Sequence, residues 1–164
     1  MASTATSDQR IDPASVRWLS ADEQVAWRAF IRGARRLIVR LDQDLRAHGL
    51  THNDYEVLVA LSDEEDDRLR MAELAEVSVE SRSRLSHHIR RLEERGLVSR
   101  EACAGDRRGQ FAVLTPAGRA LVEETAPHHV TGVREQLLDQ LEPGELEVIG
   151  RAFARVDAAL KAHA

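Results

Sequence analysis

The chain has 164 residues, enough for one domain or for one domain with a dimerisation extension. Its net charge of −5 argues against a general nucleic-acid-binding protein, and its single cysteine, Cys103, excludes an intrachain disulfide. There is no unbroken apolar run of about eighteen residues, and the N-terminus lacks the basic and apolar regions of a signal peptide. We therefore expect a cytoplasmic protein with no membrane partner. An aromatic content of 4% favours an aliphatic, helix-rich core.

Charge is distributed unevenly along the chain. From Arg68 to Arg119 there are eleven Arg and seven Asp or Glu, a net charge of +4, whereas the remaining residues carry −9. Every cation of this basic segment is arginine, whose planar guanidinium favours bidentate contacts with phosphates and bases. The asymmetry indicates one surface for a polyanion on an otherwise acidic molecule.

A long helix is predicted near the N-terminus, after a small, polar tail at residues 1–12 that we expect to be disordered. Ser20 and Glu23 have the spacing of a capping box, and the apolar pattern after them predicts a helix over 21–48. Its apolar residues cover too wide an arc for one stripe. We therefore expect the region 13–49 to contact both its own domain and a partner chain.

The central region, residues 50–115, has the pattern of a winged helix-turn-helix. Thr51 is placed as the N-cap of its first helix. A strand or lead-in at 68–71 precedes a short helix at 71–77. The acidic loop 62–67 lacks the ligand order and the glycine of a calcium-binding loop, so we interpret it as a solvated loop.

A second, donor-rich helix follows a short turn. Leu85, Ile89 and Leu92 are spaced four and three apart, which places them on one buried face. Ser81 is placed as the N-cap, and Gly96 as the left-handed residue after the C-terminus. The other faces carry hydroxyl, imidazole and guanidinium donors, which we take as candidate DNA contacts. They are Ser81, Arg82, Ser83, Arg84, Ser86, His87, Arg90 and Arg91.

Two short β-like runs follow this helix and flank a tip rich in glycine and arginine, which predicts a hairpin. The candidate contacts at the tip are Asp106, Arg107 and Arg108. Arginine can pair with guanine edges in the major groove and can read the narrow minor groove. A donor-rich helix joined to a basic hairpin therefore predicts binding to double-stranded DNA.

The C-terminal region, residues 116–164, is predicted to be helical and to serve dimerisation. Thr115 and Pro116 have the form of a cap and first helical residue, and the helix should run to about Gln140, kinked or divided at Pro127. The last helix repeats apolar residues three and four apart, a seam typical of helix–helix interfaces. The seam residues are Leu146, Ile149, Phe153, Val156 and Leu160.

In this order and at these separations, the residues resemble the MarR family of winged helix-turn-helix transcriptional regulators. The resemblance implies a mainly α fold with a small β-wing and a helical dimerisation region from the N- and C-terminal helices. It also implies a homodimer whose recognition helices enter successive major grooves of a palindromic operator, with half-sites about 10 bp apart. The pieces that carry it are Leu50-Thr51, Leu74-Ala75, Ser81-Arg82-Ser83-x-Leu85, Arg91-Leu92-Glu93, Gly96-Leu97-Val98-x-Arg100, Asp106-Arg107-Arg108 and Leu114-Thr115-x-x-Gly118.

The resemblance also implies roles for single residues. Arg108 is similar to a wing-tip arginine that enters the minor groove, and Asp106 to a carboxylate that orients a wing arginine. Arg91 is similar to a phosphate-facing or structural arginine. The chain departs from the family pattern in two places. Ser86-His87 stand where many relatives have Thr-Arg, so His87 would add less affinity at pH 7 than arginine. Ser78 and Glu80 stand where relatives often have apolar residues.

The family often binds small aromatic or phenolic acids where the dimer helices meet the DNA-binding lobe. The residues that could line such a pocket are Trp27, Phe30, His52 and Tyr55, with Arg28, Arg32 or Arg35 to hold a carboxylate. Trp27 and Phe30 also have the spacing of core residues.

We expect no metal and no cofactor, because the histidine pairs lack ligand spacing on a helix, and we interpret Cys103 as a passive thiol. The sequence therefore predicts a ligand-responsive DNA-binding regulator, with a repressor as the expected form. The alternative is a winged-helix protein–protein interaction module without specific DNA binding. An enzyme is not expected, because no phosphate-binding glycine loop or catalytic motif is present.

Overall fold

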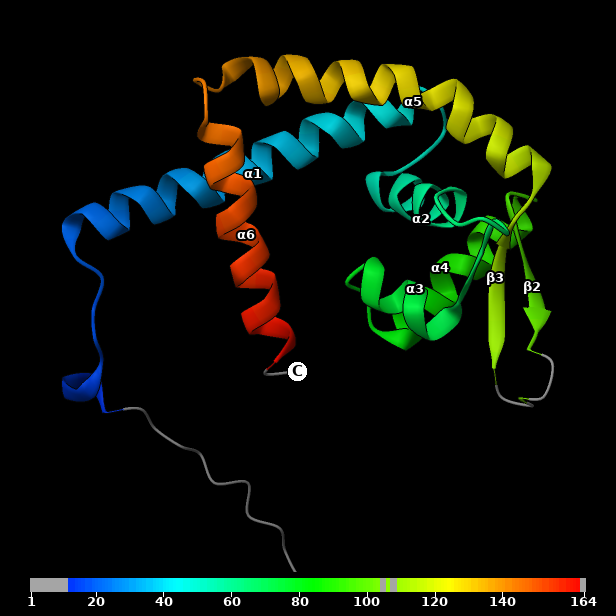
Figure 1. The fold of residues 1–164 in the computed structure, drawn as a ribbon, viewed down its shortest axis with the longest axis horizontal. Coiled ribbons are helices and arrows are strands. Elements are labelled where there is room, and N and C mark those ends of the chain that lie inside the picture. Colours follow the sequence, from blue (N-terminus) through cyan, green and yellow to red (C-terminus); the bar gives the residue numbers. More distant parts are fainter. Residues whose placement is uncertain (1–11, 104–105, 107–108, 163–164) are drawn as a thin grey trace, which may run out of the picture. The chain divides into compact units, whose positions relative to one another are not determined.

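The computed structural model describes residues 12–103, 106 and 109–162. These residues fall into two compact units, divided between Arg36 and Leu37 within the long helix α1 (Ala21–Arg46). Each unit is described by itself, and Figure 1 shows their elements. None of the described helices is long and apolar enough to span a membrane.

The first unit contains a short 3-10 helix, η1 (Pro13–Ser15), and the N-terminal part of α1. The predicted capping box is present. The hydroxyl of Ser20 accepts from the backbone N–H of Glu23 at 3.2 Å, and the Glu23 carboxylate accepts from the Ser20 N–H at 2.8 Å. The Trp27 and Phe30 rings lie 5.9 Å apart and are exposed, so neither belongs to the core of a single chain.

The second unit begins with the end of α1, which stops at Arg46 rather than near His48. Residues 47–49 form a turn instead, in which Gly49 has a φ of +73°. The remaining elements in chain order are α2 (His52–Ser62), β1 (Arg68–Arg70), α3 (Met71–Val77), α4 (Arg82–Glu94), β2 (Val98–Ala102), β3 (Gln110–Leu114), α5 (Pro116–Gln136), η2 (Leu138–Gln140) and α6 (Glu145–Lys161).

The three strands form an antiparallel sheet in the order β1-β3-β2. Ala112 of β3 is the central residue, since it pairs with Leu69 on one side and Arg100 on the other, and it is fully buried. Strands β2 and β3 form the hairpin seen beside the helices in Figure 1. The fold is thus mainly helical with a three-stranded antiparallel wing, as the resemblance implied.

The core of the second unit lies where α2, α3 and α4 meet the sheet. Burying each of its leucine side chains contributes about 1.5–3 kcal/mol before the cost of ordering the chain. The three residues predicted for the buried face of α4 are all in this core. Its fully buried side chains include Leu58, Leu61, Leu74, Leu85, Ile89 and Leu92.

The helix α5 is shorter than the sequence indicated. It ends at Gln136, because Leu137 adopts φ −129° and ψ −64°, and the short 3-10 helix η2 follows before the last helix. Thr115 caps α5 as predicted, its hydroxyl accepting from the Gly118 N–H at 3.0 Å. Pro127 lies inside α5 and does not divide it.

Candidate nucleic-acid interface

The recognition helix α4 is fixed at both ends by the signals that its sequence carries. The Ser81 hydroxyl accepts from the Arg84 N–H at 3.3 Å, which confirms the predicted N-cap. At the other end Gly96 has a φ of +71°, a conformation that favours glycine. The apolar side of α4 is buried, so its opposite face is free to meet a ligand.

Every predicted donor of this helix is exposed. The Arg90 guanidinium lies 3.1 Å from Nδ1 of His87 and 4.0 Å from the Glu94 carboxylate, so it is partly engaged within the helix. The helix thus presents a dense row of donors with no apolar residue among them. The exposed donors are Ser81, Arg82, Ser83, Arg84, Ser86, His87, Arg90 and Arg91.

An arginine from the wing holds α4 against β2. Nη2 of Arg100 donates to the carbonyl oxygen of Ser86 at 2.8 Å, and its Nε lies 3.3 Å from the Glu93 carboxylate. Arg100 belongs to the motif that carried the resemblance, and the structure gives it a positioning role. Because it uses a backbone carbonyl of α4, the wing and the recognition helix are held as one surface.

The wing also carries an arginine that the sequence reasoning missed. Arg70 of β1 lies over the Phe111 ring, 5.3 Å from its centroid, and its Nη1 is 3.7 Å from the Asp106 carboxylate. Asp106 therefore contacts an arginine outside the hairpin. The predicted contacts Arg107 and Arg108 lie outside the described residues. Pairing of β1 with β3 brings Arg70 to the wing, and no local sequence signal shows that pairing.

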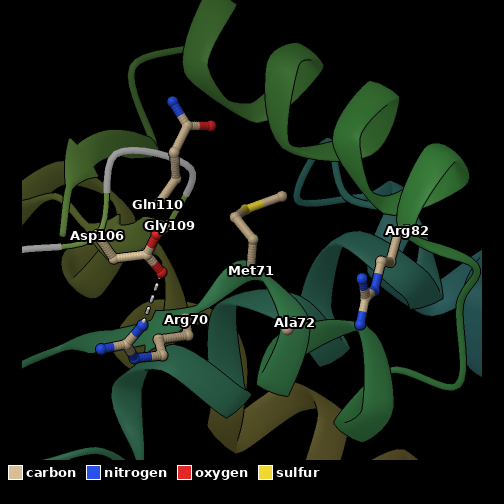
Figure 2. A pocket seen from close by; sticks show the side chains of 7 residues that line it. All are labelled: Arg70, Met71, Ala72, Arg82, Asp106, Gly109 and Gln110. Atoms are coloured by element: carbon tan, nitrogen blue, oxygen red, sulfur yellow. Dashed lines mark ion pairs between the residues drawn. The ribbon is translucent and has the colours of Figure 1, made fainter.

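A cavity of about 310 Å³ lies between the wing and the starts of α3 and α4. Figure 2 shows the Arg70 and Arg82 guanidinium groups at opposite ends of it, with the Met71 side chain between them. Arg70 is paired with Asp106 at one end, whereas the Arg82 guanidinium at the other end, beside the recognition helix, is suited to an anion such as a backbone phosphate. Its lining residues are Arg70, Met71, Ala72, Arg82, Asp106, Gly109 and Gln110.

Behind the exposed face, α4 contains a buried ionic cluster. Nε2 of His88 lies 2.7 Å from Oδ1 of Asp54, and Nδ1 lies 3.5 Å from Oε2 of Glu80. Oδ2 of Asp54 accepts from the Thr51 N–H at 3.0 Å and is 3.5 Å from Nη1 of Arg95. Burial alone raises the pKa of Asp54, but the hydrogen bonds from His88 and Thr51 outweigh it and bring the pKa to about 2.

The candidate ligand residues fall into two groups. His52 and Tyr55 belong to the second unit and lie beside His129 of α5, with ring centroids 6.4 Å and 4.6 Å from that of His129. A hydrogen bond to Glu56 raises the pKa of His52, whereas burial lowers the pKa of His129. His129 was not predicted for this site.

Trp27 and Phe30 belong to the first unit. There Trp27 borders a hollow of about 360 Å³ that is rich in arginine. This hollow includes the three arginines named as candidates for holding a carboxylate. It is lined by Trp27, Arg28, Ile31, Arg32, Arg35 and Arg36.

Two further predictions concern metal binding and the thiol. Within the described ranges, no group of three or more His, Cys, Asp or Glu side chains could hold a metal ion. Cys103 is buried at the base of the wing tip, where its backbone N–H donates to the carbonyl oxygen of Gly109 at 3.0 Å.

The predicted dimerisation seam is exposed on α6. Its five apolar side chains retain between 37% and 67% of their accessible surface, so the single chain leaves the whole seam open to water. An apolar stripe of this length is typical of a surface that another helix covers. The residues are Leu146, Ile149, Phe153, Val156 and Leu160.

The fold and this surface define a winged helix-turn-helix protein, the architecture that many DNA-binding regulators use. Comparison with known proteins narrows the class. Residues 48–109 match the family model described as "MarR family". The structure of AbsC, a MarR family transcriptional regulator from Streptomyces coelicolor, is 46% identical with a TM-score of 0.86, over 90% of this chain and 99% of that one. The chain belongs to the MarR family of transcriptional regulators and not to a family of enzymes.

Two other relatives bear on function. Sco3205 from Streptomyces coelicolor, a MarR family regulator solved in complex with DNA, is 44% identical with a TM-score of 0.86, over 88% of this chain and 92% of that one. The transcriptional repressor YetL from Bacillus subtilis is 29% identical over 111 residues, which are 66% of each chain.

Proposed function

We propose that the protein is a homodimeric transcriptional repressor that binds a palindromic DNA operator and is released or retuned by a small aromatic or phenolic acid. The observation that carries DNA binding is the recognition helix itself, since all eight of its predicted donors are exposed while its apolar side is buried. The complex of its relative Sco3205 with DNA supports the same activity, and the repressor YetL supports the sign of regulation.

In this proposal α4 enters the major groove and the wing lies along the flanking minor groove. Arg82, at the start of α4, contacts a phosphate or a base edge, and Arg70 supports it from the other end of the cavity. The exposed seam of α6 joins two copies, and their two-fold symmetry places two recognition helices about 10 bp apart on the duplex.

The ligand class follows from the chemistry of the two candidate groups. Aromatic side chains favour a flat ring, and an arginine side chain can hold a carboxylate bidentately. The first unit offers Trp27 with several arginines, and the second offers Tyr55 with two histidines. Both support an aromatic acid as the effector. Thermal-shift screening with benzoic, salicylic and nicotinic acids tests this part separately, since a ligand of the native state raises the unfolding temperature.

Selection from a random-sequence duplex pool tests DNA binding directly. The selected duplex is then titrated by fluorescence anisotropy at several salt concentrations, with Arg82→Ala and Arg134→Ala compared. Both arginines are exposed, but Arg134 lies on α5. Arg82→Ala should weaken binding and lower the salt slope by about one unit, whereas Arg134→Ala should match the wild type. Recovery of no duplex at low salt would refute the proposed function.

A further inference from the structure

His88 is the buried ionisable residue of the recognition helix. It lies on the same side as Leu85, Ile89 and Leu92 and is 3% exposed. An ionisable group on such a face costs free energy unless its partners satisfy it, so its contacts call for an explanation. The proposed DNA contacts use the opposite face of α4 and give His88 no part.

Two buried carboxylates face the two ring nitrogens of His88. Asp54, from the first turn of α2, lies 2.7 Å from Nε2, and Glu80, from the turn before α4, lies 3.5 Å from Nδ1. Their side chains are 8% and 9% exposed. Within the part of the chain that the structure describes, Oε2 of Glu80 and Nδ1 of His88 have no hydrogen-bond partner, so these two buried atoms face each other at 3.5 Å without forming a hydrogen bond.

The two contacts of the ring differ in kind. Nε2 is hydrogen bonded to Oδ1 of Asp54 at 2.7 Å, whereas Nδ1 faces Oε2 of Glu80 at 3.5 Å without a hydrogen bond. Nη1 of Arg95 lies 3.5 Å from Oδ2 of Asp54, so the Asp54 carboxylate links α2 both to His88 and to the C-terminal end of α4.

We propose that His88, held between Asp54 and Glu80, is a positioning residue that fixes the orientation of the recognition helix for sequence-specific DNA reading. The inference rests on the proposed DNA binding and adds to it. The hydrogen bond between His88 and Asp54 is directional, whereas the apolar contacts of Leu85 and Ile89 tolerate small rotations. His88 therefore fixes the rotation of α4 about its axis, and with it the direction in which its neighbour His87 points.

The turn before α4 supplies the second carboxylate of the cluster. Here the Glu80 carboxylate turns inward and meets the ring of His88. The polar residue of the turn and the buried histidine of the helix thus act as one feature of this chain.

The test compares His88→Leu and Glu80→Gln with the wild type on two duplexes, the one that the wild type selects from a random pool and a shuffled copy. Glu76→Gln serves as the matched control, since Glu76 is an exposed carboxylate on α3. We expect both cluster variants to lower the preference for the selected duplex by about tenfold, the effect of losing one base contact. Binding to the shuffled duplex and the behaviour of Glu76→Gln should not change.

A second measurement separates positioning from folding. Circular dichroism of each variant shows whether it folds.

The outcomes separate the two proposals. If the wild type selects a duplex and both cluster variants keep its full preference, His88 is not a positioning residue, although DNA binding stands. An equal loss on both duplexes, together with lost helical signal, would leave His88 a structural role only and also overturn the inference. If the wild type selects no duplex, the proposed function fails first.

Discussion

Gly118, in the first turn of α5, faces the backbone carbonyl oxygen of Leu97 so closely that no side chain fits between them. A Cβ added at Gly118 would overlap this oxygen and would lie 2.7 Å from Cδ1 of Leu114. Both neighbours are fixed, since the Leu97 oxygen also accepts from the Thr115 N–H at 3.1 Å and Leu114 is buried in the core. We therefore predict that Gly118→Ala lowers the free energy of unfolding by about 3 kcal/mol, measured by urea denaturation.

Gly33→Ala is the matched control for this substitution. Gly33 also lies within a helix, but a Cβ there would meet nothing within 4 Å. Alanine should raise stability at that position by up to about 1 kcal/mol, because it favours the helix. Equal effects of the two substitutions would show that the approach of Gly118 to Leu97 does not limit the fold.

Val79, in the turn between α3 and α4, has a left-handed backbone that β-branched residues rarely adopt. Its φ of +53° strains the backbone. Its side chain is 88% exposed, so replacing that side chain removes little packing. We predict that Val79→Asn raises the free energy of unfolding by about 1 kcal/mol, since asparagine tolerates this conformation better. The midpoint of urea unfolding measures the change.

Val130→Asn provides the comparison for the turn. Val130 is exposed on the helix α5. Asparagine relieves no backbone strain there, so the substitution should either leave stability unchanged or lower it slightly through helix propensity. If Val79→Asn proved as neutral or harmful as Val130→Asn, the turn would not hold the strain that its φ indicates.

The parts of this fold that the sequence predicted well are those with local causes. The caps at Thr51 and Ser81 and the left-handed glycine at Gly96 depend on neighbours within a few residues, and all three are present. The sequence predicted that α5 ends near Gln140, four residues after its actual end at Gln136. Gly132 lies inside α5 and does not end it, and no glycine or proline stands between Gly132 and Pro143, so the departure of Leu137 from helical geometry had no sequence signal.

Contacts between distant residues could not be predicted in the same way. Asp54 and His88 are 34 positions apart, and only the packing of α2 against α4 brings them together. Arg70 reaches the wing through the pairing of β1 with β3, which a sequence pattern does not specify. The exposed donors of α4 follow from helical periodicity alone, whereas the buried cluster behind them needed the fold.

Asp54 gives the fold a specific dependence on acidity. Its pKa in the folded chain is about 2, below the ordinary value of 3.8, so the ionised carboxylate stabilises the fold at neutral pH. This contribution of about 2 kcal/mol is complete above about pH 4 and is lost as the pH falls toward 2. Asp54→Asn removes it. We predict that the variant is about 3 kcal/mol less stable at pH 7, because His88 and Arg95 lose a charged partner.

Urea unfolding between pH 3 and pH 6 checks the direction of this pH dependence. The difference in free energy of unfolding between the wild type and Asp54→Asn should shrink as the pH falls, since the wild type then loses the stabilising carboxylate that the variant lacks at every pH. Glu64→Gln, which alters an exposed carboxylate of the loop after α2, should leave the profile of the wild type unchanged. A difference that stays constant across the range would contradict the assignment of this acid dependence to Asp54.

The seam of α6 gives a prediction about assembly. Val156 and Leu160 are 49% and 67% exposed, and covering them with a second copy would remove apolar surface from water. The double variant Val156→Glu/Leu160→Glu should therefore be monomeric in sedimentation at concentrations where the wild type is a dimer. It should also lose most of its affinity for a palindromic duplex, since a monomer reaches only one half-site.

Arg155→Glu is the control for charge on α6. Arg155 lies beside the seam and is already exposed and polar, so its replacement should leave the dimer intact. Were the double variant to sediment as a dimer, another surface would have to join the two copies.

The last prediction concerns His87, the exposed neighbour of the buried cluster on the recognition helix. A neutral imidazole releases no counterion from DNA, whereas an arginine at this position carries a full charge and a bidentate donor group. His87→Arg should therefore tighten binding to the selected duplex and steepen the salt dependence by about one unit. His128→Arg, on an exposed residue of α5, adds the same charge away from α4 and should change neither quantity. If both variants gained equally, the effect would come from net charge, and His87 would not lie at the DNA surface.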